Sequence, residues 1–317
     1  MKDHQRNYIL KAMTAIFLLF CILIIYFFTA YKTNFHLTSI NLNQIINGSR
    51  DGSKIISKDS VVIFKDKNLE KAVRDAVNKE NGELYKSDVK KITKLEAQVR
   101  GIRDLSGIEN LSNLTYLNLS GNQIGDIRPL KGLTQLTCLL LSWNKIMDIT
   151  TVKSLTNLQK FYIDGNEIAN ISPLKGLNKL EELNLHFTKV SDITALSDVP
   201  ALTTLILDDN QISNISALQR LFNLQYLDLD NNQISDVTPL KGLSNLKRLN
   251  LAQNQIIDIT PLQGLVNLTE LYVDGNEITN ITPLKGLVDL KNLNIDNNEI
   301  SDADKQSLMK GLPNIPK

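Results

Sequence analysis

The side chains most often used for proton transfer are rare in this chain of 317 residues. It contains three histidines, His4, His36 and His186. None of the spacings HExxH, GxSxG, CxxC or the phosphate-binding P-loop occurs in the sequence. As a general base, His186 would need a nucleophile or carboxylate held beside it. We therefore predict that the chain is not an enzyme and has no catalytic residue, metal site or cofactor.

Carboxylates are the more regular set of reactive groups. Five aspartates each lie two residues before a position that recurs through the chain, with Asp209 and Asp228 close by: Asp164, Asp208, Asp230, Asp274 and Asp296. Such a stripe is first interpreted as a solvated face that keeps an exposed sheet from aggregating. Two alternatives are the attraction of a basic partner and weak Ca²⁺ binding, although no EF-hand-type loop is present.

A strict repeat positions these aspartates. Asparagines recur 22 residues apart, or 44 where one is skipped: Asn122, Asn144, Asn166, Asn210, Asn232, Asn254, Asn276 and Asn298. Thr188 occupies the skipped position, so nine units keep register without insertion or deletion. Each unit follows LxxLxLxxNxIxxIxPLxxL, and this pattern at this period is the signature of leucine-rich repeats.

The spacing predicts the architecture. The Leu-x-Leu alternation gives a short strand with leucines facing inward, and the later aliphatic positions return the chain around the same core. One coil cannot bury these side chains alone, so coils must stack and terminal coils need caps. We expect the asparagines to form a buried ladder that bonds backbone groups of adjacent coils, and Thr188 to lose part of that bonding. The predicted fold is an α/β solenoid, a curved array with a parallel concave β-sheet.

The register also predicts the exposed concave positions, which lie six, four and two residues before each asparagine and at its two neighbours. Partner-binding candidates in these columns are Tyr116, Leu140, Trp143, Tyr162, His186, Phe187, Ile206, Asp208, Tyr226, Asp230, Tyr272 and Asp274. Aromatic residues in a partly apolar patch with a polar rim are typical of interface hot spots. The alternative is that strands simply favour aromatic residues.

The N-terminus predicts a membrane segment. Residues 12–31 carry no charge, and twenty helical residues span about 30 Å, the thickness of a bilayer core. Lys2, Arg6 and Lys11 precede them and favour a cytoplasmic N-terminus. A cleaved signal peptide is the alternative. The predicted organisation is a cytoplasmic N-terminus (1–11), a transmembrane signal anchor (12–31), a linker (32–60), a helical N-terminal cap (61–97), the repeats with a degenerate first coil (98–300) and a C-terminal cap (301–317).

Two motifs resemble the bacterial internalins. The unit Asn122-Gln123-Ile124-Gly125-Asp126-Ile127-Arg128-Pro129-Leu130 resembles the internalin repeat, and the segment from Ile63 to Leu69, IFKDKNL, resembles the internalin cap motif I-F-x-D-x-N-L. The resemblance covers about residues 61–300 and implies a right-handed curved solenoid that binds proteins on its concave face. The chain departs from well-known members because no immunoglobulin-like domain follows the repeats and no LPxTG motif occurs, so we expect attachment through the N-terminal helix.

We therefore predict an extracytoplasmic, membrane-anchored module that binds a protein partner, in a bacterial cell membrane of the Gram-positive type, or secreted if the N-terminal segment is cleaved. The formal charge of +1 lacks the excess of positive charge that is typical of nucleic-acid-binding proteins. We also expect no small-molecule substrate. The alternative function is a cytoplasmic adaptor resembling phosphatase-regulatory repeats of the same length.

Overall fold

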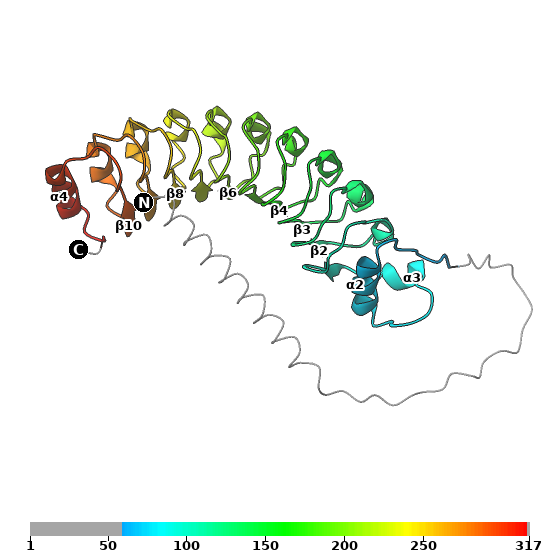
Figure 1. The fold of residues 1–317 in the computed structure, drawn as a ribbon. Coiled ribbons are helices and arrows are strands. Elements are labelled where there is room, and N and C mark those ends of the chain that lie inside the picture. The colour runs from blue at the N-terminus through cyan, green and yellow to red at the C-terminus, as the bar shows by residue number, and fades with distance from the viewer. Residues whose placement is uncertain (1–58, 316–317) are drawn as a thin grey trace, which may run out of the picture. The chain divides into compact units, whose positions relative to one another are not determined.

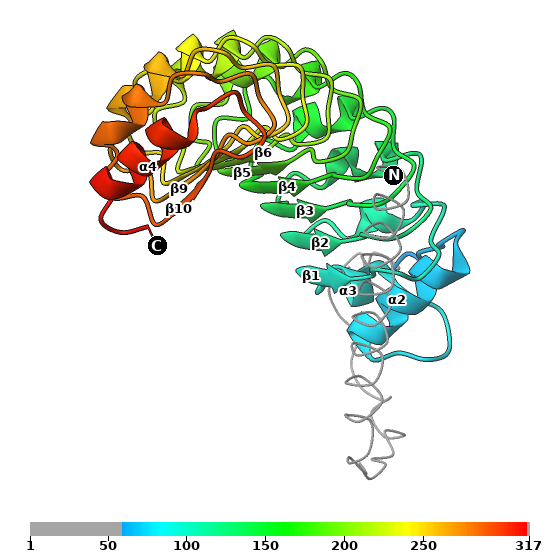
Figure 2. The same ribbon diagram turned by 60° about the vertical axis from the view of Figure 1, so that its left-hand side comes forward.

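A three-residue strand forms in every coil of the computed structural model, which describes residues 59–315 (Figure 1). The strands are β1 (Lys94–Glu96), β2 (Tyr116–Asn118), β3 (Cys138–Leu140), β4 (Lys160–Tyr162), β5 (Glu182–Asn184), β6 (Thr204–Ile206), β7 (Tyr226–Asp228), β8 (Arg248–Asn250), β9 (Glu270–Tyr272) and β10 (Asn292–Asn294). They form one parallel sheet in sequence order. The strands line the inner side of the arc, which confirms the predicted curved array (Figure 2).

The predicted segments 1–11 and 12–31 and most of the linker lie outside the described residues. Within 59–315, no helix combines the length and the apolar character needed to cross a bilayer.

Short 3₁₀ helices form the outer side of the arc (Figure 2). They are η1 (Ile108–Asn110), η2 (Arg128–Gly132), η3 (Thr150–Ser154), η4 (Ser172–Leu174), η5 (Thr194–Asp198), η6 (Ser216–Arg220), η7 (Thr238–Leu240), η8 (Thr260–Gly264) and η9 (Thr282–Gly286). In most coils an Asp or Asn just before the helix accepts its first amide, as Asp126 does from the Arg128 N–H at 2.8 Å. Five of these helices have proline in their first turn, where its missing N–H is not needed.

The core is a continuous column of aliphatic side chains between the sheet and the 3₁₀ helices. Leu117 and Leu119 from β2 and its continuation, together with Ile124, Ile127 and Leu130, are essentially inaccessible to solvent. Equivalent residues of every coil belong to the same cluster. Stacking therefore buries what a single coil would expose.

The asparagine ladder ties neighbouring coils together through the backbone. The Asn166 Nδ2 donates to the carbonyls of Leu141 in the preceding coil and Ile163 in its own coil, and its Oδ1 accepts from the Ile146 N–H at 2.9 Å. The same pattern recurs at the other ladder asparagines, although Asn144, Asn210 and Asn298 are partly exposed.

Thr188 supplies only part of this bonding. Its hydroxyl donates to the Leu185 carbonyl at 3.0 Å and contacts the Asn210 Oδ1 at 2.7 Å. In other coils a ladder asparagine accepts the amide that corresponds to the Ile168 N–H, and Thr188 makes no such bond.

Helices flank the coils at both ends of the described chain. At the N-terminal end lie α2 (Lys67–Val77) and α3 (Lys86–Val89), and at the C-terminal end lies α4 (Asp302–Gly311). In α2, Leu69, Ala72 and Val73 are buried, whereas Ala76 is exposed. The helix begins before Asn68, because the Asp66 carboxylate accepts the N–H groups of Asn68 and Leu69 and acts as the N-cap.

Candidate protein-binding surface

The predicted contact residues all lie at outward positions of the inner face or in the turns beside it. Trp143 and Phe187 are exposed, with 50% and 56% of their surface accessible to solvent. The other ten are half-buried: Tyr116, Leu140, Tyr162, His186, Ile206, Asp208, Tyr226, Asp230, Tyr272 and Asp274. The two exposed aromatic side chains are therefore the most accessible apolar groups among these candidates.

Trp143 and Phe187 lie in a turn that requires left-handed backbone geometry. We call the residue immediately before each ladder position the turn column: Gly121, Trp143, Gly165, Phe187, Asp209, Asn231, Gln253, Gly275 and Asn297. All nine have positive φ, with 56° at Trp143 and 50° at Phe187. Gly, Asn and Asp adopt this region readily, whereas a large aromatic residue does so at a cost.

The two aromatic rings meet across the coil that separates them. Their centroids are 6.1 Å apart with an interplanar angle of 25°, and we call this pair the aromatic platform. Gly165, in the intervening coil, allows the contact because the Trp143 ring lies over it. A Cβ atom at position 165 would approach that ring to 2.6 Å. A glycine between two aromatic residues thus creates a continuous apolar surface.

Tyrosines on the same face are held by polar groups of the chain itself. The Tyr162 hydroxyl donates to Glu182, which also pairs with Lys160 at 2.7 Å. Burial, followed by this bond, raises the pKa of Tyr162. The Tyr226 hydroxyl donates to Asp228 at 2.9 Å. These rings are positioned rigidly, but part of their surface is already covered.

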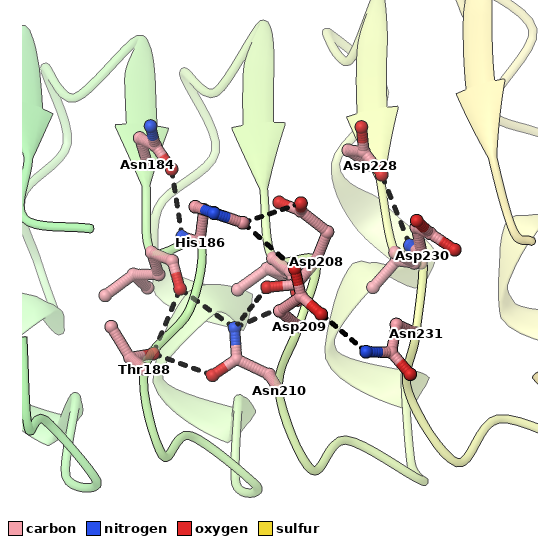
Figure 3. A network of polar contacts seen from close by, with 12 residues as sticks. Asn184, His186, Thr188, Asp208, Asp209, Asn210, Asp228, Asp230 and Asn231 are labelled. Atoms are coloured by element: carbon pink, nitrogen blue, oxygen red, sulfur yellow. Dashed lines mark hydrogen bonds and ion pairs between the residues drawn. The ribbon is translucent and has the colours of Figure 1, made fainter. Parts of the chain in front are cut away.

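Beside the platform, His186 lies among carboxylates (Figure 3). Its Nδ1 is 2.6 Å from the Asp208 Oδ2 and 3.6 Å from the Asp209 Oδ2. Its ring also lies against Phe187, with centroids 6.0 Å apart. The hydrogen bond to Asp208 raises the pKa of His186, and burial only partly opposes this. Positive charge on His186 is therefore favoured at this site.

The ligand atoms of His186, Asp208 and Asp209 converge within 4.8 Å, which is close enough to surround a metal ion. Two of them already share a hydrogen bond. The His186–Asp208 pair also resembles a general base oriented by a carboxylate, but among the described residues no hydroxyl or thiol is hydrogen-bonded to the imidazole. The arrangement supplies charge rather than an activated nucleophile.

The neighbouring coil adds two carboxylates, Asp228 and Asp230, that form no ion pair with a cation of the described chain. Burial, and then the charge of Asp228, raises the pKa of Asp230 to about 6. Burial and the charge of Asp208 likewise raise the pKa of Asp228. Burial is the main cause of both shifts, and repulsion between the neighbouring carboxylates adds to it.

The aspartate stripe is less solvated than our first interpretation required. Asp164 is 7% exposed and accepts a hydrogen bond from the Ser142 hydroxyl at 2.6 Å, and burial raises its pKa. Asp208, Asp230 and Asp274 are half-buried, and Asp296 is exposed. The solvated-face interpretation is therefore wrong for Asp164.

Two residues that shape this surface were not named in the sequence analysis: Gly165 and Ser142. For Gly165, the repeat register already contained an indication. Glycine at positions 121, 165 and 275 of one column indicates a backbone that needs positive φ, so Trp143 and Phe187 in the same column were exceptional.

Comparison with known proteins agrees with this architecture. A family model described as leucine-rich repeats (two copies) matches residues 90–132, 112–154, 156–198, 200–242, 222–264, 244–286 and 266–314. The chain belongs to the leucine-rich-repeat family. Among curated proteins, this leucine-rich-repeat chain has no significant match.

Solved structures include internalins. Internalin C2 from Listeria monocytogenes is 35% identical, and the match covers 78% of this chain and 99% of that one with a TM-score of 0.58. The predicted internalin-like character is thus confirmed. A plant peptide hormone receptor, RGFR1 in complex with RGF2, shares the fold at 22% identity and a TM-score of 0.59, over 69% of this chain and 39% of that one.

Proposed function

We propose that this chain is a non-enzymatic, membrane-anchored module that binds a protein partner on its concave face. The observation that carries the proposal is the aromatic platform, two large exposed rings stacked against each other in the turns beside the sheet. Stacked aromatic side chains supply contact area at low entropic cost because their positions are fixed before binding. The other candidates lie along the same inner face, and all but Leu140 and Ile206 have polar groups: Tyr116, Leu140, Tyr162, His186, Ile206, Asp208, Tyr226, Asp230, Tyr272 and Asp274.

Leucine-rich repeats are protein-interaction modules in many settings. The RGFR1 structure, which holds RGF2, illustrates such use of the same fold. The internalin likeness supports a bacterial cell-surface setting for this chain. The charge-free stretch 12–31 and its basic flank support anchoring by the N-terminal segment, with the repeats outside. The helical segment 61–97 would then close the first coil next to the linker.

The binding surface is tested by crosslinking capture with the full-length chain. A partner bound through the platform should be captured by wild type and lost with Trp143→Ala. Phe222→Ala is the matched control because Phe222 is 57% exposed but follows η6 on the outer side of the arc. Equal capture by all three proteins would contradict the proposed surface.

Export is tested separately by adding protease to intact cells. The proposal expects the repeats to be cleaved from outside without lysis. Protection of the repeats until the cells are lysed would instead favour the alternative, a cytoplasmic adaptor resembling phosphatase-regulatory repeats.

A further inference from the structure

The turn column contains an ordered series next to the platform. Phe187 is followed in the next coil by Asp209 and then by Asn231, whose Nδ2 donates to the Asp209 Oδ1 at 2.5 Å. Neighbouring coils are one strand spacing apart, about 4.8 Å. An aromatic ring and a fixed carboxylate therefore lie side by side on an accessible surface.

The chain itself shows what this combination holds. The Arg248 guanidinium carbon lies 4.8 Å from the centroid of Tyr226, in the preceding coil. Its Nε pairs with the Glu270 carboxylate, in the following coil, at 2.9 Å. At the other end of the sheet, Lys94 lies 4.8 Å from the Tyr116 ring and pairs with Glu96. A ring and a carboxylate together thus bind a cation twice on this face.

The aromatic platform has the ring and the carboxylate, and the cation beside them is His186 rather than a lysine or an arginine. Within residues 59–315, no lysine or arginine covers Trp143 or Phe187. Among these residues, His186 is the only positive group that pairs with Asp208 and Asp209, and Asp228 and Asp230 follow in the next coil. The Oδ1 atoms of Asp208 and Asp230 are buried without a hydrogen-bond partner in the described part of the chain.

We propose that the aromatic platform and the carboxylates of Asp208 and Asp209 form a binding site for an arginine side chain of the partner protein. The planar guanidinium stacks on the exposed ring faces, and its edge donates hydrogen bonds to Asp209, while Asp208 beside it adds negative charge. Arginine fits better than lysine because it can stack and donate in one plane. The inference rests on the proposed function and adds the chemistry of the partner.

Trp143 is the only tryptophan of the chain, so its fluorescence reports on this site in the unmodified full-length protein. The probe is acetyl-triarginine amide, titrated into the protein in detergent. The matched control peptide is acetyl-tricitrulline amide, which has nearly the same shape without the charge. A second control, acetyl-trilysine amide, has the charge but not the planar guanidinium group. We expect saturable binding of the arginine peptide, at least tenfold tighter than the lysine peptide, and no measurable binding of the citrulline peptide.

Variants locate the site. Asp209→Asn should weaken the arginine peptide about tenfold or more while keeping the turn, because asparagine accepts left-handed geometry. Phe187→Ala should also weaken it. Asp236→Asn, just before η7 on the outer side of the arc, should leave binding unchanged, because other coils have asparagine at the same position. Equal binding of the arginine and citrulline peptides, or an unchanged affinity of Asp209→Asn, would overturn the proposal.

Two further measurements separate the possibilities. If CaCl₂ or ZnCl₂ alone binds saturably and blocks the arginine peptide in an Asp209-dependent way, the site is a metal site and the arginine proposal falls. If Trp143→Ala abolishes capture of a partner but excess arginine peptide does not compete with it, the arginine proposal falls while the proposed function stands. If the peptide binds as expected but no partner depends on Trp143, the arginine site stands and the proposed function falls.

Discussion

The aromatic platform depends on Gly165. The geometry around Gly165 allows the loss of stability caused by Gly165→Ala to be worked out. Its φ of 63° lies in the left-handed region, where a Cβ atom costs about 1–2 kcal/mol. The new Cβ would also lie 2.6 Å from the Trp143 ring, so the ring must move away from Phe187. Loss of that stacking adds about 0.5–1.5 kcal/mol. We expect Gly165→Ala to destabilise the fold by about 1.5–3.5 kcal/mol.

Two other glycines separate these contributions. Gly176 has a φ of 82° and no atom within 4 Å of the place that a Cβ would take, so Gly176→Ala should cost the backbone contribution alone, about 1–2 kcal/mol. Gly132 has neither positive φ nor a neighbour within 4 Å of that place, so Gly132→Ala should be neutral or stabilise the fold by up to about 1 kcal/mol.

The assay is urea unfolding of the three variants, together with the emission spectrum of Trp143 in the folded state. Only Gly165→Ala should change that spectrum, because only there does the ring move. If Gly165→Ala and Gly176→Ala lose equal stability and both keep the wild-type spectrum, the ring does not rest on Gly165 and the platform is not built as described.

Three more substitutions test other parts of the structure. Thr188→Asn should stabilise the fold by about 1 kcal/mol, seen as a higher urea midpoint, because Oδ1 can accept the Ile168 N–H; an unchanged midpoint would contradict this account. Asp230→Asn should raise the melting temperature at pH 7.5 but not at pH 3.5. The folded pKa of about 6 exceeds the ordinary 3.8, so ionisation of Asp230 removes stability as pH rises through this window, by about 1 kcal/mol after solvent screening. Asp66→Ala should cost about 2 kcal/mol, because this carboxylate accepts the Asn68 N–H at 2.8 Å and the Arg103 N–H at 2.7 Å; loss of less than about 0.5 kcal/mol would refute that role.

The asparagine period predicted the sheet because a 22-residue repeat fixes which side chains meet. Leu117 lies opposite Leu139, and every later pair follows the same offset. The inward leucines and the role of Asn166 between coils could therefore be assigned from the sequence. The segment 61–97 was predicted only as a helical cap, because no repeat there specifies which residues of α2 face inward.

The binding surface was predicted as a set of columns but not as a platform. Register places His186 and Asp208 in one column, and their bond follows from that neighbourhood. The contact between Trp143 and Phe187 skips a coil, and it depends on the length of the indole and on the missing side chain at Gly165. Side-chain reach of this kind, and the burial of Asp164, are set by the local turn and not by periodicity.

The coil at residues 186–188 departs from its neighbours at three successive positions. Asp164-Gly165-Asn166 and Asp274-Gly275-Asn276 occupy the same places in two other coils, whereas this coil has histidine, phenylalanine and threonine. Phenylalanine brings a strained left-handed backbone, and threonine leaves part of the ladder unmade. Single substitutions could remove both costs, and neither the phenylalanine nor the threonine improves the packing of the core. What the coil gains is an exposed ring and an imidazole next to a group of carboxylates. Local instability at a site with that chemistry is expected when binding, rather than folding, determines the residues.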